Sequence, residues 1–251
     1  MPLPPMTPAQ RIARKAEKER RLLSFLISEL WTDNDNAALL WGLSADASAT
    51  TLRAMCRDRL IVRDDIPIGP RAVFPIFGIT PDGIAACDGA PPDAAEYQVG
   101  RLQPTHLPHA LAVQRLRIAA ESSGWTAWRA GRLLYGTRLP VVPDALAVDP
   151  LGNVTAIEME RNVKSLKRRR EVISGHVLAM AAGKWHRVLY VCDARADAER
   201  LRALYMSLDQ LVTPGGRTPM EDVHRARFRF VNLADFLRMP ASIAAYGPGE
   251  R

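Results

Sequence analysis

Three acidic residues beside two apolar runs are the side chains of this sequence best suited to chemistry. Asp144 opens one run, Glu158 and Glu160 close the next, and turn-forming residues 149–153 join the two. This pattern predicts a β-hairpin. On a hairpin, Asp144 and Glu158 come from neighbouring strands, so their carboxylates can share one hard cation such as Mg²⁺ or Mn²⁺.

The alternation of side chains along a strand sends Glu158 and Glu160 to the same face. Two carboxylates on one face are costly without a cation nearby. We therefore expect Asp144, Glu158 and Glu160 to bind a divalent metal, which would support phosphodiester cleavage. Lys164 or Lys167, on the next predicted helix, would oppose negative charge developing on phosphate. The alternative is a solvated hairpin end followed by an ordinary basic helix.

The elements around these acids predict an α/β domain over 105–240. Apolar spacing indicates helices over 106–122, 163–182 and 196–211, and strands over 125–134, 144–148, 154–160, 186–192 and 228–231. This order is typical of a mixed sheet flanked by helices. On the helix over 163–182, a buried stripe of Val163, Leu166, Ile173 and Val177 leaves Lys167 at its edge and Lys164 further round.

The first part of the chain has a different pattern. Helices are expected over 9–30, 34–43 and 47–60, followed by a two-stranded ribbon and a short capped helix that ends near Cys87. This pattern is typical of a winged helix-turn-helix domain over 9–87, with 88–104 as a Pro- and Ala-rich linker. In such a domain the third helix enters the major groove, and the candidate DNA contacts are Ser48, Thr50, Thr51, Arg53, Arg57 and, on the wing, Arg71. A helical module for dimerisation is the alternative.

Composition favours a polyanionic partner. The formal net charge is +7, and the basic residues cluster in 11–21 and 161–170. The second cluster adds Arg161, Arg168 and Arg169 as candidate DNA contacts; the alternative is charge that only keeps the protein soluble. Three widely spaced cysteines predict neither a disulfide framework nor a zinc site. Without a signal peptide or a long apolar run, we expect a cytoplasmic protein with no membrane partner.

Several motifs together carry a family resemblance over roughly residues 15–235. The winged-helix start, His106 and His109, Trp128-Arg129, Pro143-Asp144-Ala145, and Glu158-x-Glu160-Arg161 with Lys164-Ser165 resemble the replication-relaxation family, which includes plasmid relaxases of the mobilisation-protein-C type. The resemblance implies a restriction-endonuclease-like, PD-(D/E)xK domain and a metal-dependent nickase acting on an origin of transfer or replication. Its partners would be that DNA and a second copy or other mobilisation proteins, and its accessory residues would be His106, His109, Arg115 and Arg129.

One departure from the endonuclease motif leaves several functions open. The motif is Asp followed by Glu-x-Lys, and Glu160 stands where the lysine is expected. Either a lysine from the following helix reaches the acids, or cleavage has been lost. The open interpretations are a nickase of mobile elements, a DNA-binding regulator or accessory protein with an inactive nuclease fold, and a nuclease acting on foreign DNA.

Overall fold

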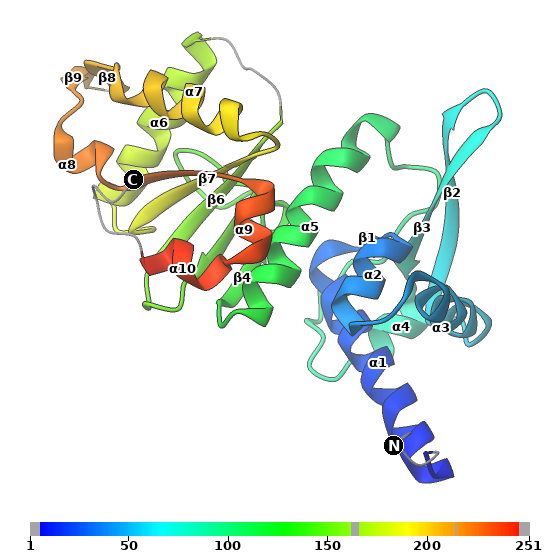
Figure 1. Ribbon diagram of the computed structural model, residues 1–251. Coiled ribbons are helices and arrows are strands. Elements are labelled where there is room, and N and C mark those ends of the chain that lie inside the picture. The colour runs from blue at the N-terminus through cyan, green and yellow to red at the C-terminus, as the bar shows by residue number, and fades with distance from the viewer. Residues whose placement is uncertain (1–5, 162–165, 214, 246–251) are drawn as a thin grey trace. The chain divides into compact units, whose positions relative to one another are not determined.

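The computed structural model describes residues 6–161, 166–213 and 215–245 (Figure 1). The chain divides into two compact units, Met1–Gln114 and Arg115–Arg251, and the division falls inside helix α5 (Leu107–Ser122). Both units mix helices and strands, which confirms the mixed α/β class predicted from the sequence. Among the described residues, no helix is both long enough and apolar enough to cross a membrane.

Helices open the first unit, and each begins at a capping side chain. They are α1 (Pro8–Glu29), α2 (Asn34–Trp41) and α3 (Ala45–Arg57). Thr7, Asp33 and Ser44 accept hydrogen bonds from main-chain N–H groups in the first turns, which would otherwise lack partners. The second half of α1 is buried, through Leu22, Leu23, Phe25 and Leu26.

A small antiparallel sheet completes this arrangement. Its strands lie in the order β1 (Trp31–Thr32), β3 (Ala72–Ile79) and β2 (Ile61–Gly69), and α4 (Pro81–Ala85) follows directly. The helices and the ribbon of β2 and β3 therefore lie close to where the sequence predicts them, whereas β1, which pairs antiparallel with β3 as a third strand, was not predicted. The exposed turn between β2 and β3 carries Arg71.

Residues 88–104, expected to form a linker, pack onto the first unit. The segment has no helix or strand before η1 (Pro104–His106), yet Tyr97 is buried in the core with Trp31 and Ile76. The Tyr97 hydroxyl donates to Asp64 Oδ2 at 2.7 Å, and the Gly100 N–H donates to the same oxygen at 2.8 Å. Because burying an aromatic side chain and satisfying a buried carboxylate both favour packing, this segment belongs to the first unit.

The start of α5 also belongs to the first unit. Gln114 Nε2 donates to the Trp31 carbonyl at 2.7 Å, and Gln114 Oε1 accepts from Thr32 Oγ1 at 2.8 Å. The Asn36 side-chain amide donates to the Leu111 carbonyl at 3.2 Å. These buried polar contacts place the boundary at Gln114, later in the chain than the predicted linker.

The second unit is built on a mixed sheet with strand order β10-β7-β6-β5-β4. The strands β4 (Thr126–Ala130), β5 (Ala145–Val148) and β6 (Val154–Glu160) pair antiparallel, whereas β7 (Arg187–Cys192) and β10 (Phe228–Asn232) continue the sheet in parallel with β6. The hairpin between β5 and β6 closes through Asp149, whose Oδ1 accepts from the Leu151 and Asn153 N–H groups. The sequence predicts this hairpin.

Helices cover both faces of this sheet (Figure 1). The main core lies between the sheet and two helices, α6 (Leu166–Ala181) and α7 (Arg195–Met206), where Ile173, Trp185, Tyr190 and Leu201 are buried together. On the opposite face, Trp125 packs edge-on against Phe236 of α9 (Leu233–Arg238), with ring centroids 6.0 Å apart.

Two predicted elements have different bounds in the structure. The helix expected over 196–211 ends at Met206, and a hairpin follows, β8 (Gln210–Thr213) with β9 (Gly216–Pro219). Ser174 on α6 accepts the Val212 N–H at 2.9 Å, so a contact from a distant helix favours the strand. The strand expected over 125–134 ends at Ala130, before η2 (Gly131–Leu133). The remaining described helices are α8 (Asp222–Arg225) and α10 (Pro240–Ala245).

Candidate functional site

Asp144 is held at the start of β5 by two main-chain contacts. The Gly131 N–H donates to the Asp144 carbonyl at 2.7 Å, and Asp144 Oδ2 accepts the Met159 N–H at 2.8 Å. A Cβ at Gly131 would lie 2.6 Å from the Pro143 carbonyl oxygen, so only glycine allows this approach. The turn after β4 therefore orients the first candidate acid.

Glu158 and Glu160 lie on β6 where the register brings them beside Asp144. Ala145 pairs with Ile157, so Asp144 lies opposite Glu158, and opposite residues of antiparallel strands project to one face. On the other side of β6, Glu158 pairs with Tyr190 and Glu160 with Cys192. Both glutamates are buried and share one face of β6, whereas the Asp144 carboxylate reaches the main chain of β6 at Met159.

His176 is a functional candidate that the sequence analysis missed. Its Nε2 lies 2.9 Å from Glu158 Oε1, and its ring is fully buried. The donor and the acceptor of this hydrogen bond depend on the histidine tautomer, and an Nε2–H would donate to an ionised carboxylate. The ring packs edge-on against Trp185, Tyr190 and Phe228. A histidine next to Val177 on an otherwise apolar helix stripe was the signal available in the sequence.

Arg169, two helical turns before His176, points to the same side of α6. Its Nε is buried and has no hydrogen-bond partner among the described residues. Burial raises the pKa of the Tyr205 phenol, and the charge of Arg169 opposes that shift. Arg169 therefore remains a predicted DNA contact, with a side chain that is half-buried rather than fully exposed.

The two candidate catalytic lysines have different outcomes. Lys167 lies two residues before Arg169, about 200° around the helix, and is exposed. It therefore projects away from the face that carries His176 and Arg169. Lys164 lies outside the described residues.

The acids influence the titrating groups around them. Burial, followed by the negative charge of Glu160, raises the pKa of the Cys192 thiol to about 11. Burial also raises the pKa of the Tyr190 phenol, with further contributions from Tyr205 and Glu158. The Cys192 thiol and the Tyr190 phenol therefore stay neutral at physiological pH.

Carboxylates at one end of neighbouring strands have the chemistry that Mg²⁺ and Mn²⁺ prefer. Within residues 6–161, 166–213 and 215–245, however, no three His, Cys, Asp or Glu side chains form a group able to hold a metal. Asp144 contacts the Met159 N–H, and Glu158 contacts His176. Metal binding by these three acids remains a prediction.

In the first unit, α3 exposes most of the predicted DNA contacts. Thr50, Arg53 and Arg57 are exposed and Thr51 is half-buried, while Arg71 is exposed on the turn between β2 and β3. Ser48 is the exception. It is fully buried and donates to the Asn34 carbonyl at 3.2 Å, because it lies on the face of α3 that packs against α2.

Two of the other predicted site residues lie in ion pairs. Arg161 contacts Asp193 at 2.9 Å, and Arg168 contacts Glu171 at 3.3 Å. Both remain partly or fully exposed. The accessory candidates divide between the units: His106, exposed, and His109, half-buried, belong to the first, and Arg115, half-buried, and Arg129, exposed on β4, belong to the second.

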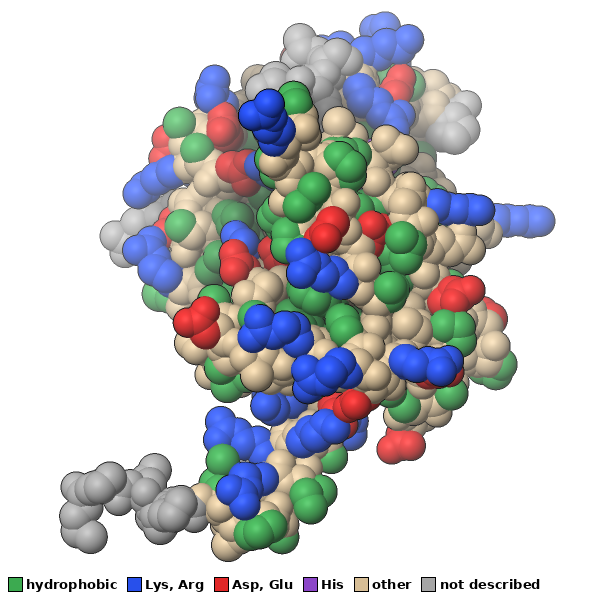
Figure 2. Space-filling view, turned by 90° about the vertical axis from the view of Figure 1, so that its right-hand side faces the viewer, with side chains coloured by type: hydrophobic (Ala, Val, Ile, Leu, Met, Phe, Trp, Pro, Cys, Tyr) green, Lys and Arg blue, Asp and Glu red, His purple; other side chains and the backbone are tan. Residues whose placement is uncertain are grey.

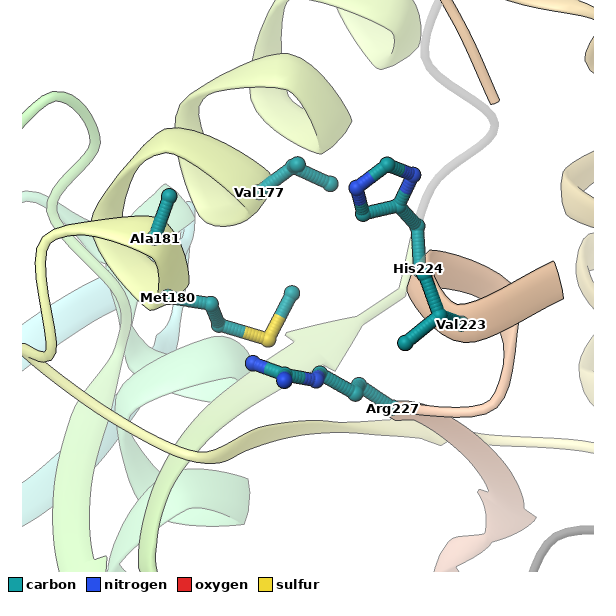
Figure 3. A pocket seen from close by; sticks show the side chains of 6 residues that line it. All are labelled: Val177, Met180, Ala181, Val223, His224 and Arg227. Carbon is teal, nitrogen blue, oxygen red and sulfur yellow. The ribbon is translucent and has the colours of Figure 1, made fainter. Parts of the chain in front are cut away.

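A largely apolar hollow lies near the other end of α6 (Figure 3). Val177, Met180 and Ala181 line it from α6, facing Val223, His224 and Arg227. His224 accepts the Glu221 N–H at 3.1 Å, so its ring caps the short helix α8. None of the candidate acids lines this hollow.

No protein-family model matches the chain, and the searches of curated proteins and of solved structures also returned no match.

Proposed function

We propose that this chain is a metal-dependent DNA nickase, with a winged-helix DNA-binding unit followed by a restriction-endonuclease-like unit. The proposal is carried by one observation: Asp144 directly precedes β5, whose first residue Ala145 pairs with Ile157 next to Glu158, and Glu160 follows on the same face of β6. The antiparallel hairpin beside parallel strands, with α6 and α7 on one face, supports the nuclease-like assignment.

Each residue of the site has a proposed role. Asp144, Glu158 and Glu160 would hold Mg²⁺ or Mn²⁺, which when bound acts as a Lewis acid on phosphate and lowers the pKa of water. The Met159 N–H orients Asp144, and the His176 ring orients Glu158. Arg169 is the described cation on this side of α6 and would oppose charge developing on the phosphate. Lys164 keeps its proposed role, whereas the position of Lys167 gives no support to one.

DNA would be brought to this site by α3 and the turn between β2 and β3. The exposed side chains of Thr50, Arg53 and Arg57 on one helix, with Arg71 on the turn, support a helix-in-groove contact. The resemblance to the replication-relaxation family supports an origin of transfer or replication as the DNA, and a role in mobilisation of plasmids or integrative elements.

A second candidate is a DNA-binding accessory protein or regulator that does not cleave. The buried contact between Glu158 and His176 favours it, because the fold already satisfies one candidate metal ligand. Glu160 in place of the motif lysine favours it too.

Supercoiled plasmid carrying candidate origin DNA, incubated with Mg²⁺ or Mn²⁺, tests both candidates. Conversion to the relaxed form by the wild type, and its loss in Asp144→Asn and Glu158→Gln with DNA affinity retained, supports the nickase. Asparagine keeps an acceptor for the Met159 N–H, so this variant separates metal binding from folding. DNA binding without cleavage in either metal supports the accessory protein. Nicking that survives in both variants rules out this active site.

A further inference from the structure

The first half of α1 is a helix without a buried face. Every residue from Pro8 to Glu17 is exposed, whereas the second half of the same helix supplies core residues. Figure 2 shows Lys and Arg side chains gathered on this projecting part of the first unit, near the bottom of the view. Since helices usually owe their stability to packing, an extended exposed stretch points to a partner that contacts it.

The cations of this helix form a stripe. Arg11, Arg14, Lys18 and Arg21 are spaced three, four and three residues apart, which puts them on one side of the helix. At a rise of 1.5 Å per residue the stripe is about 15 Å long. A duplex carries one negative charge per about 1.7 Å of its axis, so a linear row of cations matches its backbone.

Within the described part of the chain, the cations at the exposed end of this stripe have no acidic partner. Arg14 contacts the Met6 sulfur at 3.8 Å, and no described carboxylate pairs with Arg11 or Arg14. Acids on this helix engage cations off the stripe: Glu17 pairs with Arg20, and Glu19 with Lys15. Charge on the stripe is therefore available to an external polyanion.

The stripe also meets the face of α3 that is proposed to contact DNA. Lys18 Nζ lies 3.1 Å from Thr51 Oγ1, and Thr51 is the neighbour of exposed Thr50. Lys15 Nζ forms an ion pair with Asp58 Oδ2, just after α3, at 2.8 Å. Basic side chains thus continue from α3 onto α1, and the exposed Asp58 carboxylate at this junction is paired with Lys15.

We propose that the first half of α1 is a second DNA-contacting element, whose stripe binds the phosphate backbone of duplex DNA beside the segment contacted by α3. This inference rests on the proposed DNA binding by the first unit. Arg11 and Arg14 would contact phosphates through their charge and would not recognise bases, so this contact would depend little on the DNA sequence.

The test measures duplex affinity by fluorescence anisotropy over a series of salt concentrations. Arg14→Gln should reduce the slope of log affinity against log salt by about 1, and Arg11→Gln/Arg14→Gln by about 2, because each phosphate contact contributes a slope of about 0.9. The matched control is Arg20→Gln, which removes the same charge from the other side of the same helix and should leave the slope nearly unchanged. Arg11→Lys/Arg14→Lys keeps the charges and should keep the slope.

Three results would overturn the inference. The first is a wild type that binds duplex and an Arg11→Gln/Arg14→Gln variant whose salt slope equals that of the wild type. In that case α1 does not contact DNA, and the proposed binding by α3 is unaffected. The second is an equal loss in Arg20→Gln. The third is dissociation of a dimer, seen by sedimentation, that accounts for the lost affinity and makes α1 a dimerisation helix. A wild type with no affinity for duplex removes the proposed DNA binding itself, and this inference with it.

Discussion

His176 Nε2 on α6 lies 2.9 Å from Glu158 Oε1 on β6, and both side chains are buried. A buried carboxylate lowers stability unless donors replace the water it has lost. The histidine ring supplies a hydrogen-bond partner in place of water, and this contact connects the helix to the strand that carries two of the candidate acids.

Replacing His176 should therefore destabilise the second unit. His176→Leu removes a hydrogen-bond partner of a buried carboxylate, and we expect the free energy of unfolding to fall by about 2–3 kcal/mol in chemical denaturation. His106→Leu, at an exposed position, serves as the control and should change little. A double-mutant cycle with Glu158→Gln should give a coupling of about 0.5–3 kcal/mol, and no coupling would contradict the contact.

Adding a methyl group at Gly131 should displace the main chain next to Asp144 in the candidate site. Its Cβ would lie 2.6 Å from the Pro143 carbonyl oxygen, and the main chain must shift to admit it. Gly131→Ala is expected to lower the free energy of unfolding by about 1–3 kcal/mol. In Gly69→Ala the nearest atom would be 3.9 Å away, so that variant should remain close to the wild type. Equal free energies of unfolding for the two variants, measured by chemical denaturation, would show that Gly131 does not constrain Asp144.

Tyr97 should make the first unit sensitive to alkaline pH. Burial, followed by the hydrogen bond to Asp64, raises the pKa of its phenol above the ordinary value. A group whose pKa is higher in the folded than in the unfolded protein stabilises the fold. This contribution is fully present below the unfolded pKa, about 10 for a tyrosine, and is lost as the pH rises through the pKa of the folded protein. The free energy of unfolding should thus fall above about pH 10.

Tyr97→Phe is the variant that tests this origin. It should lose about 1 kcal/mol at neutral pH through the missing hydrogen bond and show a weaker pH dependence above pH 10. Chemical denaturation at several pH values, with phenolate absorbance as a second signal, measures both effects. Parallel pH profiles for the two proteins would assign the alkaline loss to other groups.

Arg53 and Arg57 should contribute to DNA affinity through the exposed face of α3. Replacing both by Ala is expected to weaken duplex binding and to lower the salt slope by about 1 for each phosphate contact removed. Arg195→Ala/Arg200→Ala on α7 removes two exposed arginines that are paired with Glu199 and Asp197. If both double variants bind alike in anisotropy titrations, α3 is not the recognition helix.

Much of the local structure could be predicted from short patterns. Capping side chains such as Ser44 and Thr80 mark helix starts because they satisfy N–H groups within the next turn. Asp149 and Gly152 mark the hairpin for a similar local reason: the side chain accepts from nearby N–H groups, and the glycine adopts φ 81. Alternation along β6 likewise predicts that Glu158 and Glu160 share a face.

The surroundings of the acids depend on contacts between residues far apart in the sequence. The Gly131 contact with Asp144, the His176 contact with Glu158 and the burial of Arg169 Nε follow from how β4 and α6 pack on the hairpin. Contacts between distant residues also place Tyr97 in the core of the first unit. They likewise favour a strand at Val212, where the sequence predicts the end of a helix. Periodicity within a segment determines which of its faces is apolar, whereas the partner of that face is determined only when the whole chain buries its apolar surface and pairs its buried polar groups.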